Sequence, residues 1–415
     1  MHHTRPVRRL LAAAALCVLA ACASVDPKPS GPYVRQGPFP APENLRAPVE
    51  FWKQVYGSWS LGQYALHDER YLDLVYEIVD LPGGAREGLS TDDKSVLRAR
   101  RDGLQAQLRE LERKQLAGES LNADEKRLRE RIVASSAGEA GVIGAAERLR
   151  AQRGIRERFA RGLEIGARYD QRFREIFQSA GVPGDLAYLP HVESSFQASA
   201  RSSVGAAGIF QFMPSTAKSY MVVHTATDER LDPLVAAQGA ARYLADAYSR
   251  LGDWGLAITS YNHGVGGLAK ARSLHGADIG RIVWDYDGKA FGFASRNFYA
   301  QFLAARELAG RTVVTPARGI QVPRENVVLD HPTSAPHLAS YYGLSVEQLS
   351  ALNPGWSPAA LGGRAMLPAG ATVWVPDQTL ARLAAAGQPA TPAELIAMAD
   401  PPRTAAAPAR KRGVR

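Results

Sequence analysis

Apolar residues between positions 155 and about 310 recur at helical spacing, in short stretches separated by Gly, Pro and Asp turns. Two-residue alternation is scarce there, so the pattern predicts an α-helical domain over 155–310. Residues 50–80 place Trp52, Val55, Tyr71 and Val75 at mostly helical spacing until Pro82. We therefore predict a helical extension over 50–154 and a mainly α fold.

The charged segment 90–136 carries leucines in a rhythm of seven and four residues on either side of Gly118. This spacing predicts an antiparallel helical hairpin, and Asn122 followed by Glu125 resembles a capping box that would start its second arm. The pattern favours a solvated structural hairpin over a coiled coil that binds a partner.

After Pro316, two β-like stretches at 326–329 and 371–375 bracket two helical stretches at 334–342 and 345–352. We predict a small βααβ unit within 318–378. Residues 388–415 contain too few large apolar residues for a core and predict a disordered basic tail.

The chain begins with three arginines, a short apolar run and Leu19-Ala20-Ala21-Cys22. This resembles the signal and lipobox of bacterial lipoproteins and implies a signal peptide over 1–21, lipidation of Cys22 and an outer-membrane anchor facing the periplasm. An ordinary secretory signal or a short membrane anchor stays open. Closely spaced prolines predict an extended tether over 22–49.

Charge and cysteine content exclude several classes of function. Of the formal charge of +9, three arginines lie in the signal and five basic residues in the last fifteen positions, which leaves a nearly neutral body without a basic stripe. Nucleic acid is therefore not an expected partner. The two cysteines, Cys17 and Cys22, both lie near the start, and the sequence has no metal-binding motif, so we expect no metal and no cofactor.

Glu193 is the candidate for chemistry. A helix from near Asp185 would end around Glu193, where the negative end of the helix dipole and the apolar neighbours Leu189, Val192 and Phe196 disfavour ionisation. A carboxyl group that keeps its proton near neutral pH can protonate the leaving oxygen of a glycosidic bond. An ordinary surface glutamate at a helix end is the alternative.

Two further segments carry polar groups in apolar surroundings. Residues 202–208 form a small-residue loop that offers hydroxyls and close backbone approach, and Gln211 follows it among apolar residues. Residues 258–264 end a helix in a Gly turn with Tyr261 and Asn262. A structural turn and an ordinary helix cap would use the same residues.

The joint spacing of three blocks resembles the soluble-lytic-transglycosylase, or goose-lysozyme-like, family, with membrane-bound D-type enzymes as the nearest group. The blocks are Glu193-Ser194-Ser195-Phe196, Ser202 to Ala217 through Gln211, and Ser260-Tyr261-Asn262-His263-Gly264. The resemblance covers about 155–310 and implies a lysozyme-like fold, Glu193 as the only catalytic acid and base, and Ser202, Gln211, Tyr261 and Asn262 as substrate-binding residues.

The resemblance also implies the reaction. Glu193 would protonate the β-1,4 oxygen between N-acetylmuramic acid and N-acetylglucosamine in peptidoglycan, and would then deprotonate the muramic C6 hydroxyl to close a 1,6-anhydro ring. A hydrolytic muramidase of the same fold and a non-catalytic peptidoglycan-binding scaffold stay open. The βααβ unit resembles a degenerate LysM module, with either glycan binding or packing against the catalytic domain as its role.

Overall fold

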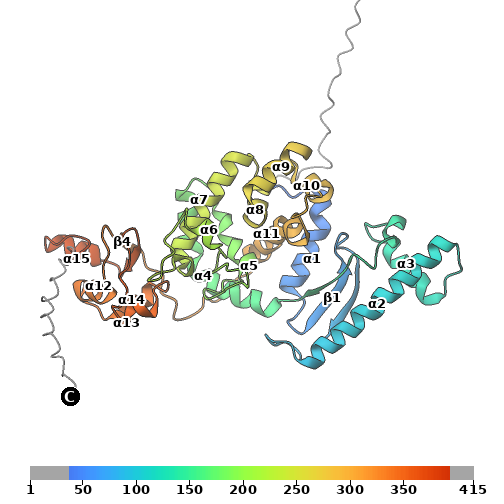
Figure 1. The fold of residues 1–415 in the computed structure, drawn as a ribbon, viewed down its shortest axis with the longest axis horizontal. Coiled ribbons are helices and arrows are strands. Elements are labelled where there is room, and N and C mark those ends of the chain that lie inside the picture. The colour runs from blue at the N-terminus through green and yellow to red at the C-terminus, as the bar shows by residue number, and fades with distance from the viewer. Residues whose placement is uncertain (1–36, 393–415) are drawn as a thin grey trace, which may run out of the picture.

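The computed structural model describes residues 37–392 (Figure 1). The predicted signal peptide, Cys22 and residues 393–415 lie outside the described residues. A helical body occupies the middle of the long axis, a sheet with two helices lies at one end, and the βααβ unit lies at the other.

The helical body is built from long helices around one apolar core. Its core includes Phe173, Phe210, Leu244, Ile258 and Phe302, all fully buried. The elements are α4 (Arg156–Ser179), η3 (Gly184–Tyr188), α5 (Leu189–Glu193), α6 (Pro214–Ala217), η4 (Glu229–Leu231), α7 (Pro233–Leu251), α8 (Trp254–His263), α9 (Val265–His275), α10 (Ile279–Asp285) and α11 (Phe293–Arg311). The predicted α-helical stretch therefore forms helices in the structure.

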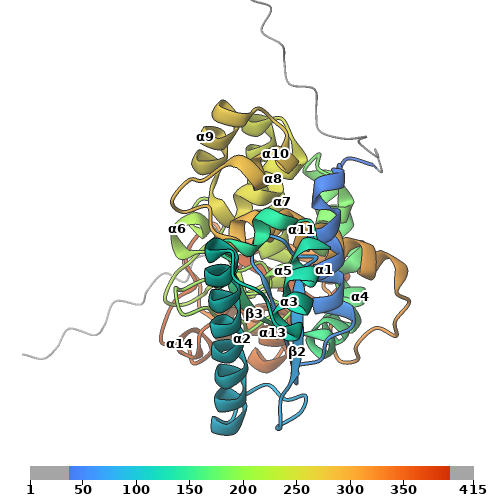
Figure 2. The same cartoon turned by 90° about the vertical axis from the view of Figure 1, so that its right-hand side faces the viewer.

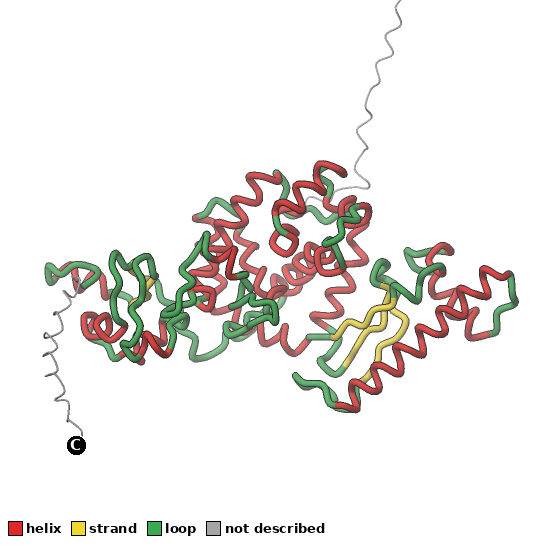
Figure 3. The backbone as a smooth tube through the Cα atoms, in the orientation of Figure 1, coloured by secondary structure: helices red, strands yellow, loops and turns green. Residues whose placement is uncertain are grey.

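The prediction of a wholly helical extension over 50–154 is wrong. After η1 (Glu43–Leu45) and α1 (Arg46–Gly57), the chain forms a three-stranded antiparallel sheet in the order β2-β1-β3 (Figure 3). The strands are β1 (Gln63–Asp68), β2 (Val75–Asp80) and β3 (Leu149–Arg153).

The sheet was missed because β2 buries side chains on both faces. Tyr76 and Val79 join one apolar cluster, while Val75 and Ile78 pack against another. A strand buried on both sides gives a continuous apolar run, which periodicity cannot distinguish from a buried helix.

The predicted hairpin is present as α2 (Thr91–Ala117) and α3 (Ala123–Val133), followed by η2 (Glu139–Val142). The capping box of Asn122 and Glu125 is confirmed. Leu104, Leu108 and Leu111 are buried in the cluster that also contains β1 and β2 side chains, and Figure 2 looks onto α2 in front of the sheet. The apolar stripe is thus covered by this chain's own sheet.

The tether predicted over 22–49 is wrong from residue 37 onward. Phe39 and Leu45 are each only 1% exposed and belong to the core of the helical body, and α1 already begins at Arg46. Pro42 directly precedes η1 and Pro48 lies in the first turn of α1, so these prolines begin short elements instead of extending the chain.

The βααβ order is confirmed by β4 (Glu325–Val328), α12 (Ala335–Tyr342), α13 (Val346–Leu352) and β5 (Thr372–Val375), with α14 (Pro358–Leu361) inserted and α15 (Thr379–Ala385) following. The strands pair antiparallel. The tail predicted from residue 388 begins too early, because Tyr341 and Tyr342 donate hydrogen bonds to the carbonyls of Pro389 and Ala390.

The helical body and the βααβ unit exchange core residues. Trp374 of β5 and Leu352 of α13 lie in the core of the helical body. Ala226, from the loop before η4, lies in the core of the βααβ unit. The two units are consequently packed as one block.

Candidate active site

Glu193 is the last residue of α5, a five-residue helix that continues directly from η3. Pro190 stands at the second position of α5, where its missing N–H costs no helical hydrogen bond. The chain then turns sharply, since the carbonyl of Pro190 accepts from the amides of both Ser194 and Phe196. The helix end predicted near Glu193 is confirmed.

The turn after Glu193 is strained. Ser195 and Phe196 have φ angles of 49° and 60°, in the left-handed region that non-glycine residues rarely adopt. Helix α4 makes room for it with glycines: a Cβ at Gly162 would lie 2.9 Å from the Ser195 carbonyl oxygen, and one at Gly166 would lie 3.1 Å from the Phe196 ring. Strain held in place by packing is typical of functional sites.

The carboxyl group of Glu193 retains its proton at neutral pH. Burial raises its pKa from 4.5 to about 8, and burial is the sole cause, without a contribution from a neighbouring charge. The residue is half-buried, so part of its surface still reaches solvent. Among residues 37–392 the carboxylate has no ion-pair partner, which leaves it available to an approaching ligand.

The loop from Ala200 to Phe212, here called the site loop, lies against the turn that follows Glu193. The Ser194 hydroxyl donates to the Ile209 carbonyl at 2.9 Å and ties the two together. Ser202 accepts a hydrogen bond from the Ala206 amide at 2.9 Å and closes the loop's own turn.

Gln211 also supports the site loop. Its side-chain amide donates to the carbonyls of Gly208 at 2.7 Å and Ala200 at 3.3 Å, and its backbone has a φ of 48°. Both bonds use the side-chain Nε2 of Gln211. Among the described residues, its Oε1 has no hydrogen-bond partner. An acceptor atom is therefore left for a ligand.

Tyr261 and Asn262 come from the last turn of α8. The Tyr261 hydroxyl donates to the Phe210 carbonyl at 2.9 Å, which joins α8 to the site loop. Asn262 is exposed, and its Oδ1 accepts from the Ser295 hydroxyl at 2.9 Å. Burial, and after it the charge of Glu193, raise the pKa of Tyr261, so its hydroxyl lies within electrostatic reach of the carboxyl group.

The sequence of this helical body matches a known family. The family model described as transglycosylase SLT domain matches residues 175–281, which include Glu193, the site loop and Tyr261. Residues 175–281 are thus similar to a transglycosylase SLT domain. The match leaves the sheet, the hairpin and the βααβ unit outside the SLT domain.

Curated relatives match parts of this chain. Membrane-bound lytic murein transglycosylase D of Escherichia coli K12 is 28% identical over 190 residues, which cover 44% of this chain and 41% of that protein. Membrane-bound lytic murein transglycosylase F 2 of Alkalilimnicola ehrlichii is 38% identical over 127 residues, which cover 29% and 27%. The chain thus spans less than half the length of these relatives.

Among solved structures, lytic transglycosylase Slt of Pseudomonas aeruginosa is 22% identical, with a TM-score of 0.28 over 35% of this chain and 24% of that one.

Two residues near the SLT site were not predicted from the sequence. Tyr56, on α1 and outside the SLT domain, is stacked on Phe159 with ring centroids 5.1 Å apart, and its hydroxyl donates to Gln301 at 3.3 Å. Burial, and secondly the charge of Glu193, raise the pKa of Tyr56. No sequence signal links α1 to Glu193, because the two are brought together only by packing on α4 and α11.

The second residue is Ser295 of α11, whose hydroxyl contacts both Asn262 and, at 3.3 Å, the Nδ1 of His263. Ser295 is buried and links the start of α11 to the last turn of α8. His263 therefore has a structural contact here.

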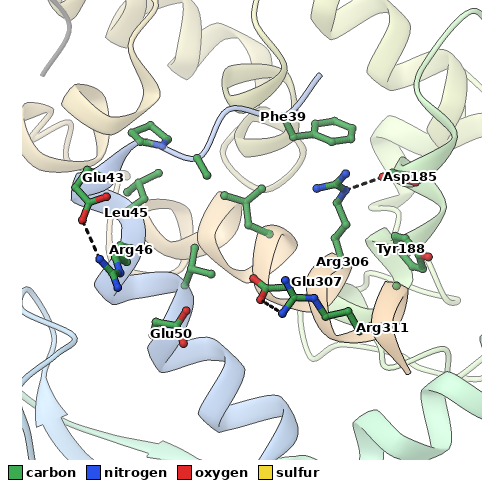
Figure 4. Close-up of a pocket in the computed structure, with 15 residues that line it drawn as sticks. Phe39, Glu43, Leu45, Arg46, Glu50, Asp185, Tyr188, Arg306, Glu307 and Arg311 are labelled. Carbon is green, nitrogen blue, oxygen red and sulfur yellow. Dashed lines mark hydrogen bonds and ion pairs between the residues drawn. The ribbon is translucent and has the colours of Figure 1, made fainter. Parts of the chain in front are cut away.

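A separate cavity of about 600 Å³ lies between the N-terminal segment, η3 and the end of α11 (Figure 4). Most of its charged side chains form ion pairs with one another, among them Arg306 with Asp185 at 2.7 Å and Arg311 with Glu307 at 2.7 Å. Glu193 is not among the residues that line it. The cavity is therefore distinct from the candidate active site.

Proposed function

We propose that this protein is a lytic transglycosylase that cleaves the β-1,4 bond between N-acetylmuramic acid and N-acetylglucosamine in peptidoglycan and forms a 1,6-anhydromuramic end. The SLT domain and the relatives named lytic murein transglycosylases support the reaction class. The observation that carries the proposal is Glu193, a protonated carboxyl group shifted by burial alone.

In the proposed reaction Glu193 acts twice. With a pKa of about 8 it is protonated at neutral pH and donates its proton to the glycosidic oxygen as the bond breaks. The resulting carboxylate takes the proton from the muramic C6 hydroxyl, which attacks C1 and closes the ring. Glu193 thus gives up one proton and regains one, and no water is consumed.

We propose that Ser202, Gln211, Tyr261 and Asn262 bind the glycan. Gln211 offers the acceptor Oε1, and Asn262, which uses only its Oδ1 within the described residues, offers the donor Nδ2. An acetamido group presents the complementary N–H and C=O. Tyr261 and Ser202 fix the site loop through their hydrogen bonds to Phe210 and Ala206.

We further propose that the protein is lipidated at Cys22 and held in the outer membrane, facing the periplasm. The relatives are named as membrane-bound. Within residues 37–392, no helix combines the length and the apolar content needed to cross a bilayer. Fractionation of cells that express the wild type or Cys22→Ala tests this, since loss of the thiol should release the protein from the membrane fraction.

Digestion of purified sacculi by the wild type and by Glu193→Gln tests the reaction. We expect muropeptides one water lighter than hydrolysis products from the wild type, and none from the variant. Glu130→Gln, at an exposed position on α3, is the matched control and should cleave normally. Reducing muramic ends would identify a hydrolase, cleavage by Glu193→Gln would reject the assignment, and inert wild type would favour a binding scaffold.

A further inference from the structure

Seven residues, Ala226 to Asp232, lie between the site loop and the βααβ unit, and we call them the bridging segment. They contain η4 and precede α7. The segment makes backbone contacts on both sides, which couple two parts of the chain that are more than a hundred residues apart.

On one side the bridging segment holds the site loop. The Arg230 guanidinium is buried and donates to the carbonyls of Gly205 at 2.8 Å and Phe212 at 3.1 Å, at the two ends of the loop's tip. Asp228 orients it through two hydrogen bonds of 2.9 Å. At Gly208, with φ of 76°, an added Cβ would lie 1.7 Å from the Arg230 carbonyl oxygen, so the two backbones are in direct contact.

On the other side the same segment is held by the βααβ unit. The Asp228 amide donates to the Gly355 carbonyl at 2.8 Å, and the Ser357 amide donates to the Ala226 carbonyl at 2.9 Å. A Cβ at Gly355 would lie 2.7 Å from the Asp228 carbonyl oxygen. The backbone of Gly355 is therefore in direct contact with the backbone of Asp228.

Two buried carboxylates of the segment are also committed to β5. Glu229 accepts from the Thr372 amide at 2.7 Å, and Asp232 accepts from the Trp374 indole at 2.8 Å. Both are at most 5% exposed. Burial raises the pKa of Asp232 to about 7, whereas its N–H donors act in the opposite direction. Without β5, these carboxylates would each lose a hydrogen-bond donor.

We infer that the βααβ unit is a positioning element of the active site, which fixes the site loop through the bridging segment, with Gly355 as one of its points of support. This inference rests on the proposed function only for its catalytic readout. It assigns to the unit a contribution to the chemical step, in addition to any contact with glycan.

Gly355→Ala is the direct test, because its methyl group must displace the Asp228 backbone. Gly362→Ala is the matched control in the same unit, since a Cβ there meets its nearest atom, the Pro358 carbonyl oxygen, at an ordinary 3.5 Å. On a short soluble GlcNAc–MurNAc tetrasaccharide we expect Gly355→Ala to lower kcat by about tenfold with KM nearly unchanged, as for a small misplacement of binding groups. Gly362→Ala should match the wild type.

Amide hydrogen exchange gives a second readout that does not depend on activity. In Gly355→Ala the amides of residues 205–212 should exchange faster than in the wild type, at a temperature where both proteins are folded. Trp374→Phe, which removes the indole donor to Asp232, should do the same if Gly355→Ala does not fold.

The outcomes separate the inference from the proposed function. Normal kcat and normal exchange of the site loop in folded Gly355→Ala, or a rise of KM on sacculi alone, would overturn the inference and leave the unit as a glycan-binding arm. Inert wild-type protein would refute the proposed function, while faster exchange of the site loop would still support the coupling.

Discussion

Replacing Glu193 by Gln should remove catalysis and at the same time stabilise the folded protein at alkaline pH. The side chain keeps its shape but can no longer ionise. In the folded protein, burial raises the pKa of Glu193 from 4.5 to about 8, so the folded state holds a proton that the unfolded chain has already released.

This difference in protonation decides whether the free energy of unfolding rises or falls with pH. Below pH 4.5 both states are protonated and Glu193 does not disfavour folding. Between pH 4.5 and 8 the unfolded state alone ionises, and the free energy of unfolding falls as pH rises. The full shift corresponds to about 5 kcal/mol at about 1.4 kcal/mol per pKa unit. Water reaches part of this half-buried side chain, so we expect about 2 kcal/mol between pH 5 and pH 9.

Urea unfolding followed by tryptophan fluorescence at pH 5, 7 and 9 measures the effect. The advantage of Glu193→Gln over the wild type should be small at pH 5 and grow with pH, whereas the exposed control Glu130→Gln should show no such trend. A Glu193→Gln difference that stays constant from pH 5 to 9 would refute the desolvated carboxyl group. In parallel, wild-type activity should decline as pH rises through about 8, because the acid form is lost.

Three further substitutions test the site loop, the contact of α1 with α11, and the hairpin. Gly208→Ala should abolish activity, since its Cβ would overlap the Arg230 carbonyl oxygen at 1.7 Å, and circular dichroism will show whether the fold survives. Tyr56→Phe removes the donor to Gln301, and we expect a loss of about 1 kcal/mol in the free energy of unfolding, measured by urea unfolding. Leu108→Ala empties a fully buried site in the hairpin and should cost about 2–5 kcal/mol in urea unfolding, with kcat on short glycans retained.

Sequence patterns among neighbouring residues predict several features of the structure. The helix end at Glu193, the capping box at Asn122 and the βααβ order all depend on residues a few positions apart, and all are present. The hydrogen bonds of the helix end and of the capping box form within one element or one turn, so the sequence specifies them directly, whereas β4 pairs with a strand far along the chain.

Non-local packing accounts for what was missed. The apolar residues of β2 predict a helix because they pack on both faces of the strand, and the prolines around Phe39 predict a tether although Phe39 lies in the core. Tyr56 and Arg230 reach the site from segments whose local patterns carry no sign of chemistry. Their roles follow only from which helices and loops the fold brings together.

Trp374 of the βααβ unit lies in the core of the helical body, and Ala226 of the helical body lies in the core of the βααβ unit. This arrangement affects how the chain folds and where it can be truncated. A module that can be moved between proteins carries a closed core of its own, whereas the core of this βααβ unit includes Ala226 from outside the unit, and its Trp374 fills a site in the helical body. Ending the chain after α11 would leave that site empty and Asp232 without its indole donor. The helical body and the βααβ unit should therefore unfold in one cooperative transition. Although they are separate segments of the sequence, neither should unfold independently of the other.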